Sequence, residues 1–406
     1  MLMKASDNKL TPQLRFPEFK NSGEWEEDIA KNIFMTISEK NHPVLSVLAA
    51  TQEYGMVKRD DINYKIQYNN ENTSSYKKVS KGDFVIHLRS FQGGFAYSDI
   101  EGITSPAYTV FRIQNIDKHS PYFWKYIFSS TQFIKKLELI TYGVRDGRSI
   151  SFKDFSQFKF LFPSLKEQKK IAEFLSSVDE LIDNEKNKLE NLKEYKKGLL
   201  QSLFPKENQK VPDLRFPEFK NSGDWEEKQL GELTFDINEH NNSNSIKVLS
   251  VTNTYGIVEQ EEVFKKIIAS EDLSNYRVIK KGDIAYNPSR INVGSVDILH
   301  KYELGIMSPM YVVVRCQANI LNNVFLKQWL ISNTFYSLLE RNLQGGVRKS
   351  LPYNLFKEMK ILIPSLKEQQ KIADFLSSVD ELIIEQVKKI QILQEYKQGL
   401  LQKLFL

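Results

Sequence analysis

The chain has 406 residues, 41% hydrophobic and 26% charged, with a net charge of +5. This composition is that of a globular protein of two or three domains, and it excludes a small disulfide-stabilised scaffold. Cys316 is the single cysteine, so an intrachain disulfide and a cysteine-ligated metal cluster are also excluded. The five histidines never show the four-residue spacing of a helical metal pair, and no metal site is predicted.

The N-terminal sequence MLMKASDNKL lacks the apolar core of a signal peptide. No run of about 18 apolar residues predicts a membrane-spanning helix. We therefore expect a cytoplasmic protein.

The first part of the chain predicts a globular head of mixed α and β structure. Residues 80–88 (SKGDFVIHL) and 107–113 (AYTVFRI) have the alternating pattern of strands. A helical stretch is predicted from Phe123 to Leu139, and a glycine-flanked loop follows at 142–151.

Residues 163–204 predict a long helix. The segment opens with Ser164 and has Glu167 three residues later, the pattern of a capping box. Apolar residues then recur with an average step of 3.5, which is typical of a coiled coil. The seam residues expected to pair helices or contact a partner are Ile171, Val178, Ile182, Glu185, Leu189, Leu192 and Lys196.

The rest of the chain repeats this plan. LRFPEFKNSGEWEE (14–27) returns as LRFPEFKNSGDWEE (214–227), and 29 of 42 positions in 163–204 are identical in 364–405. The second head predicts strands at 280–287 and 310–316, a helical stretch from Phe325 to Leu343, and a loop at 345–353. The second set of seam residues is Ile372, Val379, Ile383, Gln386, Ile390, Leu393 and Lys397.

We therefore predict an α+β fold with two globular α/β heads, separated by two long antiparallel coiled-coil helices in a pseudo-two-fold internal repeat. Helices of this length are rods of about 50 to 60 Å, which would hold the heads at a fixed separation. The predicted segments are a leader and first head at 1–162, a helix at 163–204, a linker and second head at 205–363, and a helix at 364–406.

The polar seam residues suggest a register for the antiparallel pair. Placing Glu185 opposite Lys397 also places Lys196 opposite Gln386. Polar residues then meet polar residues along the whole seam, and such residues can fix the register of a coiled coil.

The positive charge is concentrated in the two heads. Residues 28–162 carry +5 and residues 228–363 carry +3, whereas both long helices are neutral. This distribution is compatible with a phosphate-binding surface on each head, although +5 and +3 are ordinary for domains of this size. The polar loop residues we expect to contact DNA are Arg89, Gln92, Arg145 and Arg148 in the first head, and Asn287, Arg290, Asn292, Arg348 and Lys349 in the second.

Motifs for catalysis are not found in the sequence. It has no GxxxxGK[ST] phosphate loop. The string from Asn287 to Arg290 lacks the second proline and the aromatic ring of an adenine methyltransferase tetrad. No catalytic residue is therefore predicted. A self-contained DNA methyltransferase or nuclease, and a scaffold with protein-binding heads, remain the alternatives to a DNA-recognition protein.

With these motifs the chain resembles the specificity subunit of type I restriction-modification systems. The resemblance rests on LRFPEF at the start of each half, on the KGD strand entries, and on PSLKEQ leading into each long helix. It also includes two Ser-Pro-x-Tyr strings, Ser105-Pro106 with Tyr108 and Ser308-Pro309 with Tyr311.

The resemblance implies a DNA-binding subunit without catalytic activity. Each head would read one half of a split, asymmetric sequence in double-stranded DNA, and the antiparallel helices would set the spacer. The same helices would dock two modification subunits, which hold the methyl donor and methylate adenine. Separate restriction subunits would supply ATP- and magnesium-dependent translocation and cleavage, so this chain itself is expected to hold no cofactor.

Overall fold

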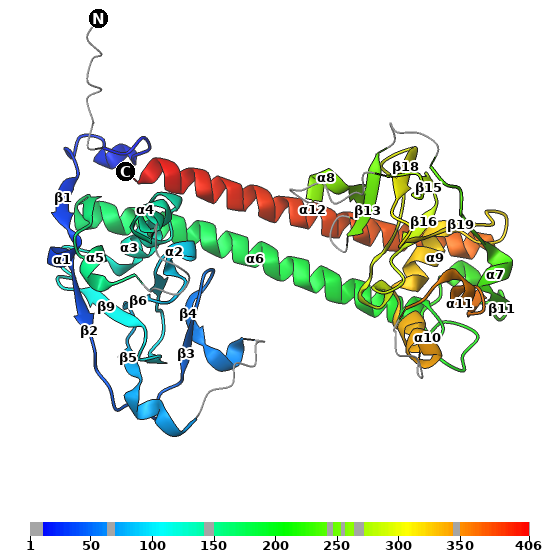
Figure 1. Ribbon diagram of the computed structural model, residues 1–406, viewed down its shortest axis with the longest axis horizontal. Helices are drawn as coiled ribbons and strands as arrows, with labels where there is room; N and C mark the ends of the chain where they lie inside the picture. Colours follow the sequence, from blue (N-terminus) through cyan, green and yellow to red (C-terminus); the bar gives the residue numbers. More distant parts are fainter. Residues whose placement is uncertain are drawn as a thin grey trace, which may run out of the picture. The chain divides into compact units, whose positions relative to one another are not determined.

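The computed structural model describes residues 11–62, 70–141, 150–241, 247–252, 256–263, 272–343 and 350–405. These residues form two compact units (Figure 1). Unit 1 contains the described residues up to Lys186 together with those from Lys389 onward, and unit 2 contains those from Asn187 to Lys388. Each unit therefore combines one head with parts of both long helices, α6 (Leu165–Leu203) and α12 (Leu366–Leu404).

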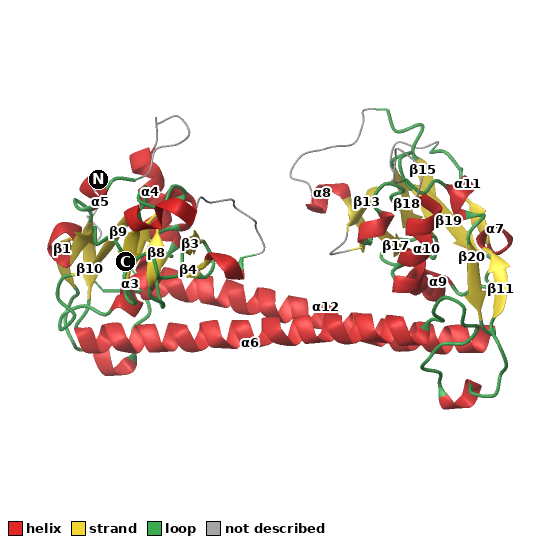
Figure 2. Ribbon diagram, turned by 90° about the horizontal axis from the view of Figure 1, so that it is seen from below, coloured by secondary structure: helices red, strands yellow, loops and turns green. Residues whose placement is uncertain are grey.

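The first head is built around a four-stranded antiparallel sheet with the order β2-β9-β6-β7. The pairs β3-β4 and β5-β8 lie beside it, and β1 pairs with β10 at the junction with the long helix. Figure 2 shows these strands with their short helices. The elements are β1 (Glu26–Ile29), α1 (Ala30–Ile33), β2 (Phe34–Ile37), β3 (Leu48–Thr51), β4 (Gly55–Lys58), β5 (Lys77–Val79), β6 (Phe84–Ile86), α2 (Ser90–Gly93), β7 (Ala96–Tyr97), β8 (Gly102–Thr104), β9 (Thr109–Ile113), α3 (Pro121–Phe128), α4 (Thr131–Thr141), α5 (Phe152–Phe155) and β10 (Lys159–Phe162).

The second head repeats this plan in a different sequence. Its sheets have the orders β12-β19-β16-β17 and β14-β13-β18-β15, and β11 pairs with β20. The elements are β11 (Glu226–Gln229), α7 (Leu230–Leu233), β12 (Thr234–Asp236), β13 (Val248–Thr252), β14 (Gly256–Glu259), α8 (Gln260–Val263), β15 (Arg277–Lys280), β16 (Ile284–Tyr286), β17 (Val296–Ile298), β18 (Leu304–Met307), β19 (Val312–Cys316), α9 (Asn323–Leu330), α10 (Asn333–Leu343), α11 (Tyr353–Phe356) and β20 (Lys360–Ile363).

Each predicted head helix is in fact two helices, which corrects the sequence analysis. Two residues, the second of them a serine, separate α3 from α4 and α9 from α10. The Ser130 hydroxyl donates to the Ile127 carbonyl (2.7 Å) and accepts from the Phe133 N–H (3.2 Å). Ser332 makes the same two bonds with Trp329 and Phe335. One hydroxyl therefore satisfies the end of one helix and the start of the next, as a capping residue does.

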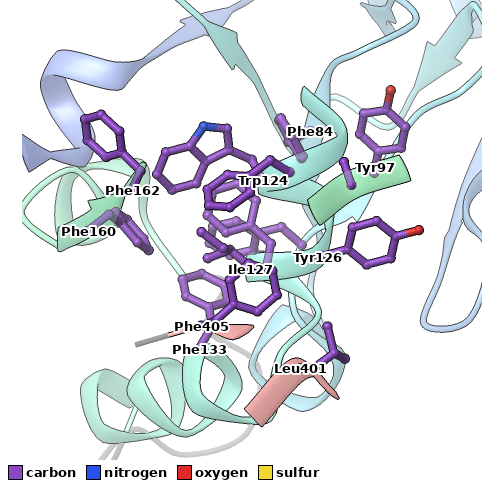
Figure 3. Packing of buried hydrophobic residues seen from close by; sticks show 14 of the residues in the cluster. Phe84, Tyr97, Trp124, Tyr126, Ile127, Phe133, Phe160, Phe162, Leu401 and Phe405 are labelled. Atoms are coloured by element: carbon purple, nitrogen blue, oxygen red, sulfur yellow. The ribbon is translucent and has the colours of Figure 1, made fainter. Parts of the chain in front are cut away.

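The C-terminal end of each long helix packs into the core of the head from the other repeat. In unit 1, Leu400, Leu401, Leu404 and Phe405 belong to the buried aromatic cluster of the first head. Figure 3 shows Phe405 among these rings, and its centroid lies 5.5 Å from that of Phe123.

Unit 2 has the equivalent arrangement. Leu199, Leu200, Leu203 and Phe204 belong to its core, and the Phe204 ring lies 5.3 Å from that of Phe325. Within each unit the two long helices therefore run antiparallel and side by side (Figure 1). None of the helices in the described parts of the chain is long and apolar enough to cross a membrane.

This exchange predicts which head is destabilised by a substitution at the end of each long helix. Phe405→Ala should destabilise unit 1 by about 3 to 5 kcal/mol, the usual effect of deleting a buried phenylalanine ring. Amide hydrogen exchange should therefore accelerate in the first head, although Phe405 follows the second head in sequence. Phe204→Ala should accelerate exchange in the second head.

Tyr396→Ala, which truncates an exposed aromatic side chain of α12, is the matched control and should leave exchange in both heads unchanged. Faster exchange in the head that precedes each substituted helix in sequence would contradict the exchanged arrangement.

Candidate nucleic-acid interface

The KGD motif of each head fixes the strand that leads into the candidate DNA-binding loop. Asp83 is buried and receives two hydrogen bonds of 2.9 Å from Arg112 on β9, while its Oδ2 accepts from the Ser80 N–H. Asp283 does the same with Arg315 on β19, at 2.7 and 2.8 Å. Bidentate arginine–carboxylate pairs restrict geometry strongly, so the start of β6 and of β16 is fixed relative to the neighbouring strand.

The loop after β6 carries Arg89 and Gln92, and both side chains are exposed. Ser90 is buried between them, and its hydroxyl accepts from the His87 N–H at 2.8 Å. Burial lowers the pKa of His87, and the nearby Arg89 guanidinium lowers it further. The backbone of this turn is thus held from the inside while its two long polar side chains face solvent.

The loop after β16 has the equivalent position and a different sequence. Arg290 and Asn292 are exposed, whereas Asn287 is half-buried. The Asn287 side-chain oxygen accepts from the Ser289 N–H at 3.0 Å, which makes it part of the turn. The structure thus assigns Asn287 a role in shaping the loop, beside the predicted DNA contact that is still to be tested.

In the second head, Leu351 contacts the loop after β16. The Leu351 N–H donates to the Pro288 carbonyl at 3.0 Å, so the chain that leaves the 345–353 loop lies against the β16–β17 loop. In the first head, α4 packs against α2 and leads towards the 142–151 loop. The predicted contact residues Arg145, Arg148, Arg348 and Lys349 lie outside the described residues.

The sequence analysis missed what the repeated blocks do. Arg15, from LRFPEF, donates two 2.7 Å hydrogen bonds to the buried carboxylate of Glu167 in α6. Arg215 does the same with Glu368 in α12, at 2.7 and 2.8 Å. Glu167 therefore does not complete the predicted capping box. Its N–H still reaches the Ser164 hydroxyl at 3.5 Å, but its carboxylate binds the leader.

The neighbouring glutamine connects each long helix to its head. Gln168 accepts from the Ser120 N–H at 2.9 Å and donates to the Lys118 and Pro163 carbonyls. Gln369 makes the same bonds with Asn322, Ile320 and Pro364. The exact repetition of Arg-Phe-Pro and Lys-Glu-Gln in the two halves is the sequence signal that points to this anchor.

The seam residues of the long helices are either buried or partly buried. Ile171, Val178 and Ile182 are in the core of unit 1, and Ile372 and Val379 are in the core of unit 2. Ile390 and the carboxylate-bearing Glu185 are also buried. The partly buried members are Leu189, Leu192, Lys196, Ile383, Gln386, Leu393 and Lys397.

The predicted register of the helices is wrong by about two turns. Lys397 pairs with Asp179 (2.5 Å), six residues before the expected Glu185. Lys196 pairs with Asp380 (2.5 Å), six residues before the expected Gln386. Glu185 itself pairs with Lys389 at 3.1 Å. A displacement close to one heptad keeps apolar residues on the seam, and here the aspartates beside the seam decide between the registers.

Comparison with known proteins identifies the family. The model of the type I restriction modification DNA specificity domain matches residues 23–194 and again residues 222–395. The chain therefore belongs to this family, and it contains the family's domain twice.

Two relatives are similar over part of their length. The MjaVIII specificity subunit of a type I restriction enzyme from Methanocaldococcus jannaschii is 29% identical over 59% of this chain, and the match spans 60% of that protein. The HindI specificity subunit from Haemophilus influenzae is 26% identical over 45% of this chain and 41% of its own length.

Solved structures share the fold. A type I restriction-modification S subunit from M. genitalium has a TM-score of 0.56 and 14% identity, with 98% of this chain and 99% of that chain covered. A chain from a structure concerned with complex assembly and conformational transition of the type I R-M system also gives 0.56, with 16% identity over 94% of this chain and 97% of that one.

The loop that carries Arg89 ends at Gly94, and we expect replacement of this glycine to lower the stability of unit 1 measurably. Gly94 has φ +81°, and a Cβ there would lie 1.9 Å from the Phe128 carbonyl oxygen. Gly94→Ala should therefore lower the stability of unit 1 by clearly more than the roughly 1 to 3 kcal/mol that a sparsely populated backbone conformation alone costs an L-residue. Urea unfolding of the full chain measures the difference.

Gly23→Ala is the matched control. Gly23 has nearly the same φ of +80°, but no atom lies within 4 Å of its added Cβ. Equal destabilisation by the two substitutions would mean that Gly94 is required only for its backbone angle, and that the close approach to α3 is not what holds this loop.

Proposed function

We propose that the chain is the DNA-recognition subunit of a type I restriction-modification complex, and that each head reads one half of a two-part sequence in double-stranded DNA. The observation that carries the proposal is the double match to the DNA specificity domain. The two heads have the same internal framework, but they carry HLRSFQGG and NPSRINVG at the same place after β6 and β16. Like frameworks with unlike exposed loops suit two readers of unlike half-sites.

The subunit acts by binding, without chemistry of its own. We propose that the methyl donor, ATP and magnesium are held by the modification and restriction subunits, and that the complex works in the cytoplasm. The names of the M. jannaschii and H. influenzae relatives, both specificity subunits of type I restriction enzymes, support this division of labour.

The exposed loop arginines provide the test. Arg89→Ala should weaken binding about tenfold at duplexes that carry the first half-site, because an arginine contact to a base is worth about 1 to 3 kcal/mol. Arg290→Ala should act at the second half-site alone. The measurement is duplex binding by the chain assembled with its modification subunits, at fixed salt, after mapping methylated adenines has given the target.

Lys159→Met is the control, because Lys159 is an exposed cation of the first head paired with Glu27 on the β1–β10 sheet, which is separate from the sheet of β6. Equal losses at both half-sites from Arg89→Ala would contradict the two-reader proposal. Methyl transfer by the purified chain alone would favour the self-contained enzyme. Absence of any sequence preference in the complex would favour the protein scaffold.

We further propose that the long helices dock the modification subunits through exposed apolar pairs. In unit 1, Leu181 and Tyr396 are 44% and 54% exposed; Tyr396 directly precedes Lys397, and Leu181 follows Asp179 after one residue. In unit 2, Tyr195 and Leu382 are 53% and 51% exposed beside Lys196 and Asp380. Two similar surfaces suit two copies of one partner.

Replacing Leu181 and Tyr396 together by serine should therefore remove one modification subunit and leave the other bound. Native mass spectrometry of the assembled complex measures the number of copies. Ile116→Ser, at a 70% exposed position of the first head, is the control and should leave two copies. Retention of both copies by the double variant would place the docking surface elsewhere.

A further inference from the structure

Each unit contains a three-way contact that joins its head to both long helices. In unit 1, the Asp179 carboxylate of α6 receives the Lys397 ammonium of α12 on Oδ1 at 2.5 Å. Its Oδ2 accepts from the Tyr126 hydroxyl of α3 at 2.9 Å. The same hydroxyl lies 3.1 Å from the Ser176 Oγ, and the Lys397 Nζ lies 5.7 Å from the centre of the Tyr126 ring.

Unit 2 has the same contact with the helices exchanged. Asp380 of α12 receives Lys196 of α6 on Oδ1 at 2.5 Å, and its Oδ2 accepts from the Gln328 amide of α9 at 2.8 Å. Tyr126 and Gln328 are each the sixth residue of their helix, and both are buried. We call these two sets, Lys397–Asp179–Tyr126 and Lys196–Asp380–Gln328, the lysine–aspartate clamps.

The clamps are partly buried, so their charges strongly constrain the positions of the residues that they join. Their lysine and aspartate side chains are 11% to 27% exposed, so salt and water screen them less than surface pairs. Burial lowers the pKa of Lys196, and the Asp380 carboxylate opposes that change. Because each carboxylate uses one oxygen for the second helix and the other for the head, moving either partner breaks a charged hydrogen bond.

The two clamps differ in the number of cations close to the aspartate. In unit 2 a second cation, Lys327 of α9, lies 3.8 Å from Asp380 and 3.8 Å from Asp297 of β17. Asp380 therefore keeps a positive neighbour when Lys196 is removed. In unit 1 the lysine at the equivalent position of α3, Lys125, pairs with Asp99 instead, at 3.9 Å.

We propose that Lys397 and Lys196 are positioning residues for DNA reading, and that each acts on the head of the other repeat. Lys397 follows the second head in sequence, but through Asp179 and Tyr126 it fixes the position of the first head on the long helices. Lys196 follows the first head in sequence and fixes the position of the second head. The inference rests on the proposed DNA-recognition function, and it adds the residues that align each reader with its half-site.

The test uses the full chain assembled with its modification subunits and four duplexes, with both half-sites intact, either one scrambled, or both scrambled. Lys397→Met should reduce discrimination of the first half-site about tenfold, the effect of losing one charge-assisted hydrogen bond, and leave the second unchanged. Lys196→Met should act at the second half-site, and by less, because Lys327 remains. Lys397→Arg and Lys196→Arg, which keep the charge, should restore most of the discrimination.

The control is Lys388→Met, because Lys388 is exposed on α12 and forms no ion pair among the described residues. Thermal unfolding midpoints separate positioning from stability, since a merely structural lysine would lower the midpoint and affinity for both half-sites together. Equal loss at both half-sites, or loss at the half-site of the preceding head, would overturn the proposal.

A second measurement does not depend on DNA. Hydrogen exchange should accelerate in α3 with Lys397→Met and in α9 with Lys196→Met. If the unaltered complex shows no half-site preference, the proposed function fails. The exchange pattern then still decides whether each lysine controls the head of the other repeat, and unchanged exchange in both helices would overturn that connection.

Discussion

The exchange of helix ends between the two repeats is the constraint on which the rest of the structure depends. Neither head completes its core with its own helix alone, because each core also contains the end of the other long helix. The first cluster needs the rings and leucines from 400 to 405, and the second needs those from 199 to 204. Because burying these side chains is worth several kcal/mol in each unit, separating the two helices would open both cores at once.

The repeated sequence blocks attach the leaders and the heads to the long helices, which explains their repetition. Arg15 and Arg215 hold the leaders on the long helices, while Gln168 and Gln369 hold the helices on the heads. These anchors use the near-identical blocks together with backbone groups of the heads. The exposed loops of a head can therefore change while its attachment to the helix stays the same. This explains why the two heads differ in sequence although the blocks that flank them are nearly identical.

Much of the fold follows from the sequence, because repetition reveals the units and a period of 3.5 over about 40 residues reveals the helices. The register does not, because a shift of nearly one heptad leaves the apolar pattern intact, and Asp179 and Asp380 lie just off the seam. The serine breaks between the head helices were missed because Ser130 and Ser332 cap through two local bonds without a glycine or proline to mark them. The loop residues Arg89 and Arg290 were predictable as exposed, whereas the turn-forming role of Asn287 depends on a bond visible only in three dimensions.

The order of the two units along the chain also affects how the protein folds during translation. Unit 2 is one continuous stretch from Asn187 to Lys388, but unit 1 needs the segment from Lys389 onward. The first head is thus translated before the second, but its core is complete only when Leu400 to Phe405 have been made. Nascent chains usually fold from the N-terminal domain onward. In this protein the core of the first head stays incomplete until the second head has been translated.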